Sequence, residues 1–404
     1  MTALSRVVAL DEGKFADTVW GREPLLSRAA DLGGPDGFTD LLSPAAVDEL
    51  LSRRGLRTPF LRVARDGEVL PPARFTGGGG AGAEVADQVL DDRAMHLYAT
   101  GATLVLQGLH RLWPPLIAFA GELGAALNRP VQLNAYLTPP SSQGFATHYD
   151  THDVFVLQAG GAKRWRVHPP VLPDPLERQP WGGRADEVAA TAAGEPALDV
   201  VLEPGDALYL PRGWLHSARS VGGRSLHITA GVRGLTRYAL VEELLALASA
   251  DPSLRATLPY GLEVSDPDAI APELTATVAA LRDWLATADP AAVADRLRAR
   301  SWSSARPAPI SPLAQLDAAA ALTPAGTIAV RPGLRWSLTA DGELRSPVRT
   351  VRFPASCVPA VRLALDGAPH RVGDLPLDDD ADRLVLARRL LTEALAVPVT
   401  PTTG

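Results

Sequence analysis

The stretch that most restricts the fold runs from residue 203 to residue 216 and reads EPGDALYLPRGWLH. Its Pro-Gly pair predicts a turn, the apolar segment 207–210 predicts a short strand, and the Pro-Arg-Gly segment 211–213 predicts a second turn. His216 then falls where the next strand should begin. A neutral imidazole at such a position is well suited to bind a metal ion.

A second pair of metal-binding residues lies earlier in the chain, in His148-Tyr149-Asp150. In a strand, residues two positions apart point to the same face, so His148 and Asp150 can reach one metal ion together. Two histidines and one carboxylate form the facial triad of non-haem Fe(II) sites, which leaves coordination positions open for a co-substrate and O2. The alternative is an ordinary β-sandwich whose histidines are core or surface residues.

These segments, together with Asn134-Ala135-Tyr136 and the GAKRWRV stretch at 161–167, resemble the JmjC/cupin-type Fe(II)- and 2-oxoglutarate-dependent oxygenases, specifically the ribosomal oxygenase group. The resemblance covers most of the chain and is strongest in the middle. It implies a mixed fold with a double-stranded β-helix (jelly-roll) core and flanking helices. An α-helical dimerisation-like region and a C-terminal winged-helix-like domain should follow. It also implies that His148, Asp150 and His216 hold Fe(II), with 2-oxoglutarate and O2 as co-substrates.

Lysine is rare in this chain, because only Lys14 and Lys163 stand among its 39 basic residues. An ammonium group acts as a compact point charge, whereas the arginine side chain presents a wider planar fork. In the ribosomal oxygenases of eukaryotic type, the matching lysine binds the far carboxylate of 2-oxoglutarate. The resemblance therefore assigns Lys163 to that carboxylate, and the alternative is an ordinary strand-end lysine facing solvent.

Three further residues are expected to line the co-substrate pocket. Asn134 and Tyr136 alternate along one strand and should face the same side. The resemblance places Asn134 near the iron and Tyr136 near 2-oxoglutarate, although structural hydrogen bonds in the core are an alternative. His227 lies in the alternating segment 225–229 and is expected to line the pocket without binding iron, while His152 is expected at the surface or behind the ligands.

The composition sets limits on the class of protein. A chain of 404 residues, 46% hydrophobic and 21% charged, is long enough for two or three domains. Its single cysteine, Cys357, excludes an intramolecular disulfide and is typical of a cytoplasmic protein. We expect neither a signal peptide nor a membrane span, because no apolar run is long enough. The net charge of −7 argues against direct nucleic-acid binding.

The resemblance, together with the helical and linker segments of the sequence, implies three domains. Residues 1–237 form the catalytic domain, 238–305 a helical dimerisation-like domain, and 306–404 the winged-helix-like domain. The Pro-, Gly- and Ala-rich insert at 169–199 is expected to cover the mouth of the cleft, and 77–82 to form a glycine-rich surface loop. Helices are expected from Ser43 and over 115–127, 236–250, 274–286, 291–300, 359–365 and 380–395, and strands at 334–339 and 350–353.

The expected function is that of an Fe(II)- and 2-oxoglutarate-dependent oxygenase that hydroxylates a protein side chain. The resemblance implies histidine, or alternatively arginine, of a ribosomal protein as the target, and a homodimer as the assembly. Two alternatives stay open at this point. The substrate could be a peptide or a natural product, or the chain could be a non-catalytic metal-binding cupin.

Overall fold

The computed structural model describes residues 2–33, 36–304 and 306–399. The chain divides into two compact units, Met1–Gly234 and Leu235–Gly404. Each unit is described by itself. Residue 305, where the helical domain was expected to end, and residues 400–404 of the expected C-terminal domain lie outside the described residues.

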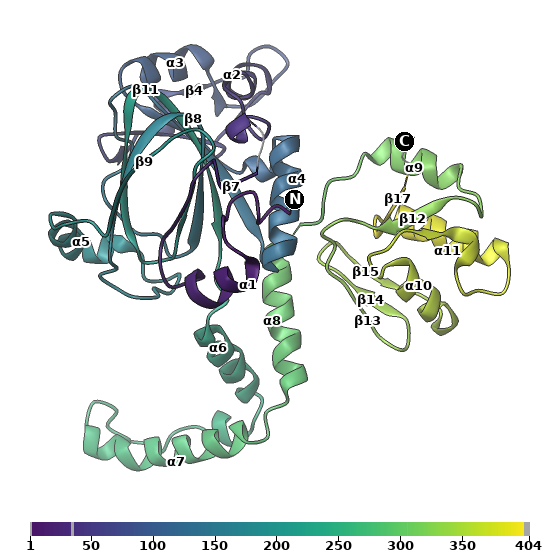
Figure 1. Ribbon diagram of the computed structural model, residues 1–404. Coiled ribbons are helices and arrows are strands. Elements are labelled where there is room, and N and C mark those ends of the chain that lie inside the picture. The colour runs from purple at the N-terminus through teal and green to yellow at the C-terminus, as the bar shows by residue number, and fades with distance from the viewer. Residues whose placement is uncertain (1, 34–35, 305, 400–404) are drawn as a thin grey trace. The chain divides into compact units, whose positions relative to one another are not determined.

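The first unit is built on a nine-stranded antiparallel sheet that curves round into a barrel (Figure 1). Its strand order is β1-β10-β8-β11-β7-β6-β2-β3, and β9 pairs with β8. The strands are β1 Leu25–Ser27, β2 Leu61–Arg65, β3 Glu68–Val69, β6 Thr103–Leu106, β7 Val131–Thr138, β8 Asp153–His168, β9 Leu198–Leu202, β10 Ala207–Leu210 and β11 Leu215–Val232. A separate pair joins β4 Thr76–Gly77 to β5 Gln88–Val89, so the glycine-rich loop is the connection of a hairpin.

The long strands β8 and β11 give the barrel its double-stranded form. The first half of β8 pairs with β10 and its second half pairs with β9, while β11 pairs with β8 along most of its length. The two halves meet at Gly161, whose φ of 61° and close approach to the carbonyl of Arg224 exclude a side chain. This bent pair is the jelly-roll core that the sequence predicts.

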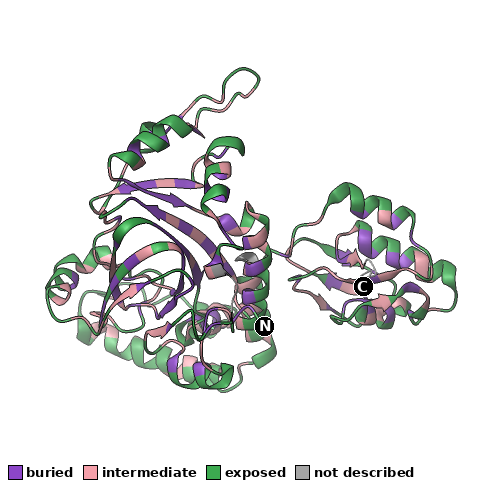
Figure 2. Ribbon diagram, turned by 45° about the horizontal axis from the view of Figure 1, so that its top comes forward, coloured by how far each residue is buried: buried purple, intermediate pink, exposed green. Residues whose placement is uncertain are grey.

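Strand alternation separates two hydrophobic layers. Phe155 and Leu157 of β8 belong to the core shared with the N-terminal helices, whereas Val154 and Val156 belong to a second cluster with Trp165. Helix α4 (Pro114–Leu127) lies beside β7 and buries Leu116, Phe119 and Leu123 (Figures 1 and 2). The barrel interior is therefore lined by the second set of side chains, which leads to the candidate site.

The α-helices of the first unit are α1 Glu12–Lys14, α2 Pro44–Arg53, α3 Asp91–Ala99, α4 and α5 Ala185–Ala192. Two of them, α2 and α4, were predicted from the sequence, whereas α1, α3 and α5 were not. Helix α2 begins where predicted, because Ser43 accepts a hydrogen bond from the amide of Ala46 and proline takes the first helical position. Helix α5 lies within the insert at 169–199, where the sequence predicted no helix.

The second unit begins with three helices, α6 Arg237–Ala248, α7 Pro267–Leu285 and α8 Pro290–Ser304. Helix α7 starts well before its predicted first residue, 274. Its cap is Asp266, and Pro272 lies inside the helix although proline usually ends one. Ion pairs of 2.7 Å join Glu243 to Arg296 and Glu242 to Arg300, and these connect α6 to α8.

The remainder of the second unit has its own hydrophobic core, which includes Ile328, Leu344 and Leu390. It contains α9 Pro312–Ala320, β12 Thr327–Val330, β13 Ser337–Leu338, β14 Glu343–Arg345, β15 Thr350–Arg352, α10 Val358–Ala364, β16 His370–Arg371, α11 Asp380–Thr392 and β17 Ala396–Pro398. The sheets run β16-β12-β17 and β13-β14-β15. Helix α11 ends before its predicted end at residue 395, because Ala394 adopts a left-handed conformation (φ 57°). In the part of the chain described here, no helix is long and apolar enough to span a bilayer.

Candidate active site

Three predicted metal ligands converge at one mouth of the barrel. One ligand atom from each of His148, Asp150 and His216 lies within 4.8 Å of the others. The two imidazole centroids are 4.5 Å apart, and His216 Nε2 lies 3.8 Å from Asp150 Oδ2. His216 is the second residue of β11, as predicted, whereas His148 and Asp150 lie in the segment before β8 and not within a regular strand.

Backbone hydrogen bonds hold the two ligand segments together. The His148 amide donates to the His216 carbonyl at 3.2 Å, and the His216 amide donates to the His148 carbonyl at 2.8 Å. The Gly213 amide donates to the Asp150 carbonyl at 2.9 Å. Tyr149 is buried on the other side, where its hydroxyl donates to the carbonyl of Gln179 at 2.9 Å. The alternation that the sequence predicted therefore holds, although only His148 pairs as a strand does.

The hydrogen bonds of the two histidines determine which ring nitrogen can bind a metal. His148 Nδ1 lies 2.8 Å from the carbonyl of Ala146, and His216 Nδ1 lies 3.1 Å from the carbonyl of Trp214. A carbonyl can only accept, so each Nδ1 carries the proton and each Nε2 presents a lone pair. Both Nε2 atoms are therefore prepared for metal binding.

The charges around the triad favour the ligand forms of its residues. Burial lowers the pKa of His216 to about 4, so its ring is neutral near pH 7. Burial acts to raise the pKa of Asp150, but the neighbouring His216, His152 and His148 and the Arg62 guanidinium outweigh it and lower that pKa. An ionised Asp150 carboxylate and a neutral His216 imidazole are donors of the kind that a divalent cation requires.

Lys163 lies in the barrel interior, on the second half of β8. Its side chain is 3% exposed, so the alternative of a solvent-facing lysine is wrong. Nζ donates to Thr138 Oγ1 at 3.0 Å, and no carboxylate pairs with it among the described residues. Burial lowers the pKa of Lys163 to about 7. A buried amine with one neutral partner retains donors for an anionic ligand.

The other predicted pocket residues lie on strands beside Lys163. Tyr136 and His227 are paired across β7 and β11, and their rings stack at 4.7 Å with 5° between the planes. Burial raises the pKa of Tyr136 to about 12, so its hydroxyl remains protonated. Asn134 shares the face of Tyr136, but its Oδ1 already accepts a hydrogen bond from the amide of Gly108 at 3.0 Å. The side-chain amide nitrogen of Asn134 is the donor that could reach an anionic ligand.

Trp165 completes this side of the pocket. Its ring meets the ring of His227 edge-on at 5.4 Å and lies 6.1 Å from the ring of His216. Within the described residues, Trp165 Nε1 and His227 Nδ1 are buried polar atoms without a hydrogen-bond partner. Buried polar groups in native proteins nearly always have partners, so this cluster indicates a ligand or ordered water.

Sequence reasoning missed Arg62, Phe145 and Trp181 as residues of the site. The guanidinium of Arg62 lies 5.0 Å from the Phe145 ring and hydrogen-bonds to Tyr136. The rings of Phe145 and Trp181 lie 6.0 Å and 6.3 Å from the ring of His148. Trp181 belongs to the insert at 169–199, which supports the expected position of the insert at the cleft. No short sequence pattern points to Arg62 as a site residue. It comes close to Tyr136 only because β2 pairs with β6 and β6 pairs with β7 in this register.

His152 is not among the residues that could hold the metal. Its ring lies against Gly231 of β11, where a side-chain Cβ would come within 2.8 Å of it.

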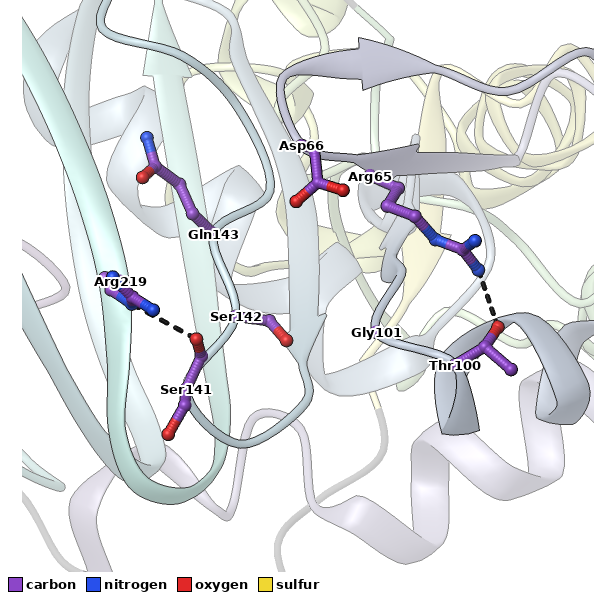
Figure 3. A pocket seen from close by; sticks show the side chains of 8 residues that line it. All are labelled: Arg65, Asp66, Thr100, Gly101, Ser141, Ser142, Gln143 and Arg219. Carbon is purple, nitrogen blue, oxygen red and sulfur yellow. Dashed lines mark hydrogen bonds between the residues drawn. The ribbon is translucent and has the colours of Figure 1, made fainter.

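A separate polar hollow of about 280 Å³ lies near the loop before His148 (Figure 3). It is lined by Arg65, Asp66, Thr100, Gly101, Ser141, Ser142, Gln143 and Arg219, which include none of the predicted site residues.

Comparison with known proteins places this site in a family. The JmjC domain family matches residues 122–240, which include the triad, Lys163 and the other predicted pocket residues. The chain contains a JmjC domain. Its architecture is the JmjC cupin-type fold, with antiparallel sheets and flanking helices, as the resemblance implied.

Curated proteins match part of this chain. Human ribosomal oxygenase 1 is 35% identical over 224 residues, which are 53% of this chain and 32% of the relative. The bifunctional lysine-specific demethylase and histidyl-hydroxylase NO66 of Aedes aegypti is 31% identical over 267 residues, 61% of this chain and 38% of the relative. The chain thus spans only about a third of the length of these relatives.

Solved structures extend the likeness to nearly the whole chain. The ribosomal oxygenase YcfD of Escherichia coli has a TM-score of 0.56 and 17% identity, covering 97% of this chain and 99% of YcfD. YcfD in complex with cobalt and 2-oxoglutarate has a TM-score of 0.55, with the same identity and coverage. At this level of identity the likeness establishes the fold.

We expect His148→Ala, Asp150→Ala and His216→Ala each to remove cobalt binding while the protein stays folded. Mutation of residues that hydrogen-bond to metal ligands typically lowers metal affinity roughly 10- to 100-fold. Loss of a ligand itself should therefore lower cobalt affinity more than about 100-fold. Calorimetric titration with Co(II) and circular dichroism measure the two properties. His152→Ala is the control and should bind cobalt nearly as well as the native protein. Native affinity in any triad variant would remove that residue from the ligand set.

We expect Lys163→Met to stabilise the metal-free protein, and this gain to shrink as the pH rises. The pKa is about 7 when the protein is folded and 10.5 for a free lysine side chain. Between these values the unfolded chain binds the extra proton, so native stability rises with pH by up to about 1.4 kcal/mol per unit. Urea denaturation from about pH 6 to about pH 10 measures the difference in the free energy of unfolding. Exposed Lys14→Met should show no such trend, and a pH-independent difference for Lys163→Met would contradict the buried, unpaired amine.

Proposed function

We propose that this protein is an Fe(II)- and 2-oxoglutarate-dependent oxygenase that hydroxylates a histidine or arginine side chain of a ribosomal protein. The proposal is carried by two features within one JmjC domain: the converging side chains of His148, Asp150 and His216, and the buried Lys163, which has no carboxylate partner among the described residues. Either feature alone is compatible with a non-catalytic cupin. Together they provide a metal site and a charged pocket for an anionic co-substrate.

The residues present fit both groups. His148, Asp150 and His216 supply two imidazole nitrogens and one carboxylate, the donor set of non-haem Fe(II) oxygenases. Lys163 and Thr138 offer the polar hydrogens that a carboxylate requires at the inner end of the pocket. The cobalt and 2-oxoglutarate bound by the structural neighbour YcfD support this assignment.

When bound, Fe(II) and 2-oxoglutarate supply the oxidising chemistry, in which O2, 2-oxoglutarate and a C–H bond give succinate, CO2 and an alcohol. His148, Asp150 and His216 would hold the metal, and three protein ligands would leave coordination positions for the co-substrate and O2. Lys163 orients the co-substrate by its charge. Phe145 and Trp181 form apolar walls beside His148, where they exclude water and confine the substrate side chain.

The names of the relatives support the choice of substrate. Ribosomal oxygenase 1 and the histidyl-hydroxylase NO66 are named for a ribosomal target and for histidine. A cytoplasmic location would bring the enzyme to ribosomes. Histone demethylation is not proposed.

The first test compares intact masses of ribosomal proteins from cells with and without the gene. We expect one ribosomal protein to lose the mass of a single oxygen atom when the gene is deleted. Returning the native gene to the deletion strain should restore the original mass. A gene that encodes Asp150→Ala should not restore it, because this variant lacks a proposed metal ligand. Unchanged masses throughout would contradict a ribosomal substrate and would favour a peptide or natural product instead.

We also propose that residues 238–305 form a dimerisation domain and residues 306–404 a winged-helix-like domain. Helix α7 has no buried residue, and Leu274 and Val278 are 59% and 56% exposed on it. Leu240 and Leu245 of α6 are likewise exposed. Such apolar exposure is typical of a surface that a second copy covers. The C-terminal domain pairs many of its arginines with acids, so no direct nucleic-acid binding is proposed.

We expect light scattering to give the mass of a dimer at micromolar protein concentration. The double variant Leu274→Glu/Val278→Glu should be monomeric, because it places charge on the exposed apolar face of α7. Ala276→Glu, at an exposed position on the opposite face of the same helix, is the matched control. A monomeric native protein, or a double variant that remains dimeric, would contradict this interface.

A further inference from the structure

Trp165 has an unusual environment for a buried tryptophan. It is 4% exposed, and its indole Nε1 has no hydrogen-bond partner among the described residues. An indole nitrogen can only donate, so it requires an acceptor when it is removed from water. Trp214 shows the usual arrangement, because its Nε1 donates to the carbonyl of Arg22 at 3.1 Å. The donor of Trp165 is thus buried without an acceptor from the described protein.

The position of Trp165 connects it to both ends of the proposed pocket. It follows Lys163 by two residues on β8, so the two side chains project from the same face of the strand. Its ring contacts the ring of His227 and lies 6.1 Å from the metal ligand His216. Across the sheet it faces Ala218, whose small side chain offers no acceptor. Trp165 therefore lies between the charged and the metal-binding parts of one pocket.

The ring is also held rigidly. Trp165 belongs to a buried cluster with Val154, Val156, Val167 and Leu208. A donor on such a fixed ring loses little side-chain freedom when an acceptor arrives. A dicarboxylate brings several acceptor oxygens and two negative charges, whereas Lys163 supplies a single cation. The pocket therefore needs further donors to satisfy such a ligand.

We propose that the indole N–H of Trp165 donates a hydrogen bond to a carboxylate oxygen of 2-oxoglutarate and is a second co-substrate-binding group beside Lys163. This inference rests on the proposed function, because it assumes that the pocket receives 2-oxoglutarate. Trp165 holds the co-substrate in position and takes no part in moving electrons or protons. The other possible acceptor, an ordered water molecule, is an outcome of the test.

The test measures 2-oxoglutarate binding to the cobalt-loaded protein by calorimetry in the absence of O2. Trp165→Phe keeps an aromatic ring and deletes the donor. We expect it to weaken 2-oxoglutarate binding roughly 10- to 100-fold, as for a hydrogen bond to a charged acceptor, with cobalt affinity unchanged. Trp336→Phe is the control, since Trp336 packs against the separate hydrophobic core of the second unit. Its 2-oxoglutarate affinity should equal that of the native protein.

The outcomes separate the inference from the proposed function. If the cobalt-loaded native protein binds no 2-oxoglutarate, the proposed function fails. If it binds and Trp165→Phe binds equally well, the inference is overturned and the donor serves water.

A second measurement does not depend on the folding of the variant. In the zinc-loaded native protein, 2-oxoglutarate should shift one of the eight tryptophan indole N–H signals downfield in the NMR spectrum. Binding without such a shift would likewise overturn the inference.

Discussion

The reciprocal pair of backbone hydrogen bonds between His148 and His216 is the constraint on which the site depends. It joins a segment before β8 to the start of β11 and brings together ligands that are far apart in the chain. The same pairing directs both side chains to one side, while Tyr149 is buried on the other. The close approach of the two imidazoles is therefore a consequence of strand pairing, and the Nδ1 hydrogen bonds to nearby carbonyls set the ring orientation.

The barrel interior contains more polar groups than a purely structural core would retain. Lys163, Trp165 and His227 are all buried, yet their polar atoms have few or no partners in the described protein. Burial of such groups opposes folding. A ligand that accepts their hydrogen bonds removes this cost, which explains why an interior of this kind belongs to a binding pocket. The aliphatic part of the same barrel, around Val154 and Val156, supplies the compensating apolar burial.

The surroundings of the site are assembled by register across several strands. Arg62 of β2 lies opposite Val105 of β6, which lies opposite Tyr136 of β7, which lies opposite His227 of β11. This row brings the Arg62 guanidinium close to Asp150 and Tyr136. Together with the neighbouring histidines, the guanidinium lowers the pKa of Asp150, and it hydrogen-bonds to Tyr136. The insert adds Trp181 from a different direction.

Local chemistry determined a large part of this protein. The convergence of His148, Asp150 and His216, the strand that carries Asn134 and Tyr136, and the capped start of helix α2 could all be predicted, because each depends on short-range spacing or on residues with few alternative roles. Tertiary structure alone decided that Arg62 and Trp181 reach the site and that the Asn134 oxygen is occupied by Gly108. It also decided the short strands β12, β14, β16 and β17, whose two to four residues are too few for a readable alternation. The physical reason is common to these cases: register and side-chain packing join residues distant in the chain, and no local pattern carries that information.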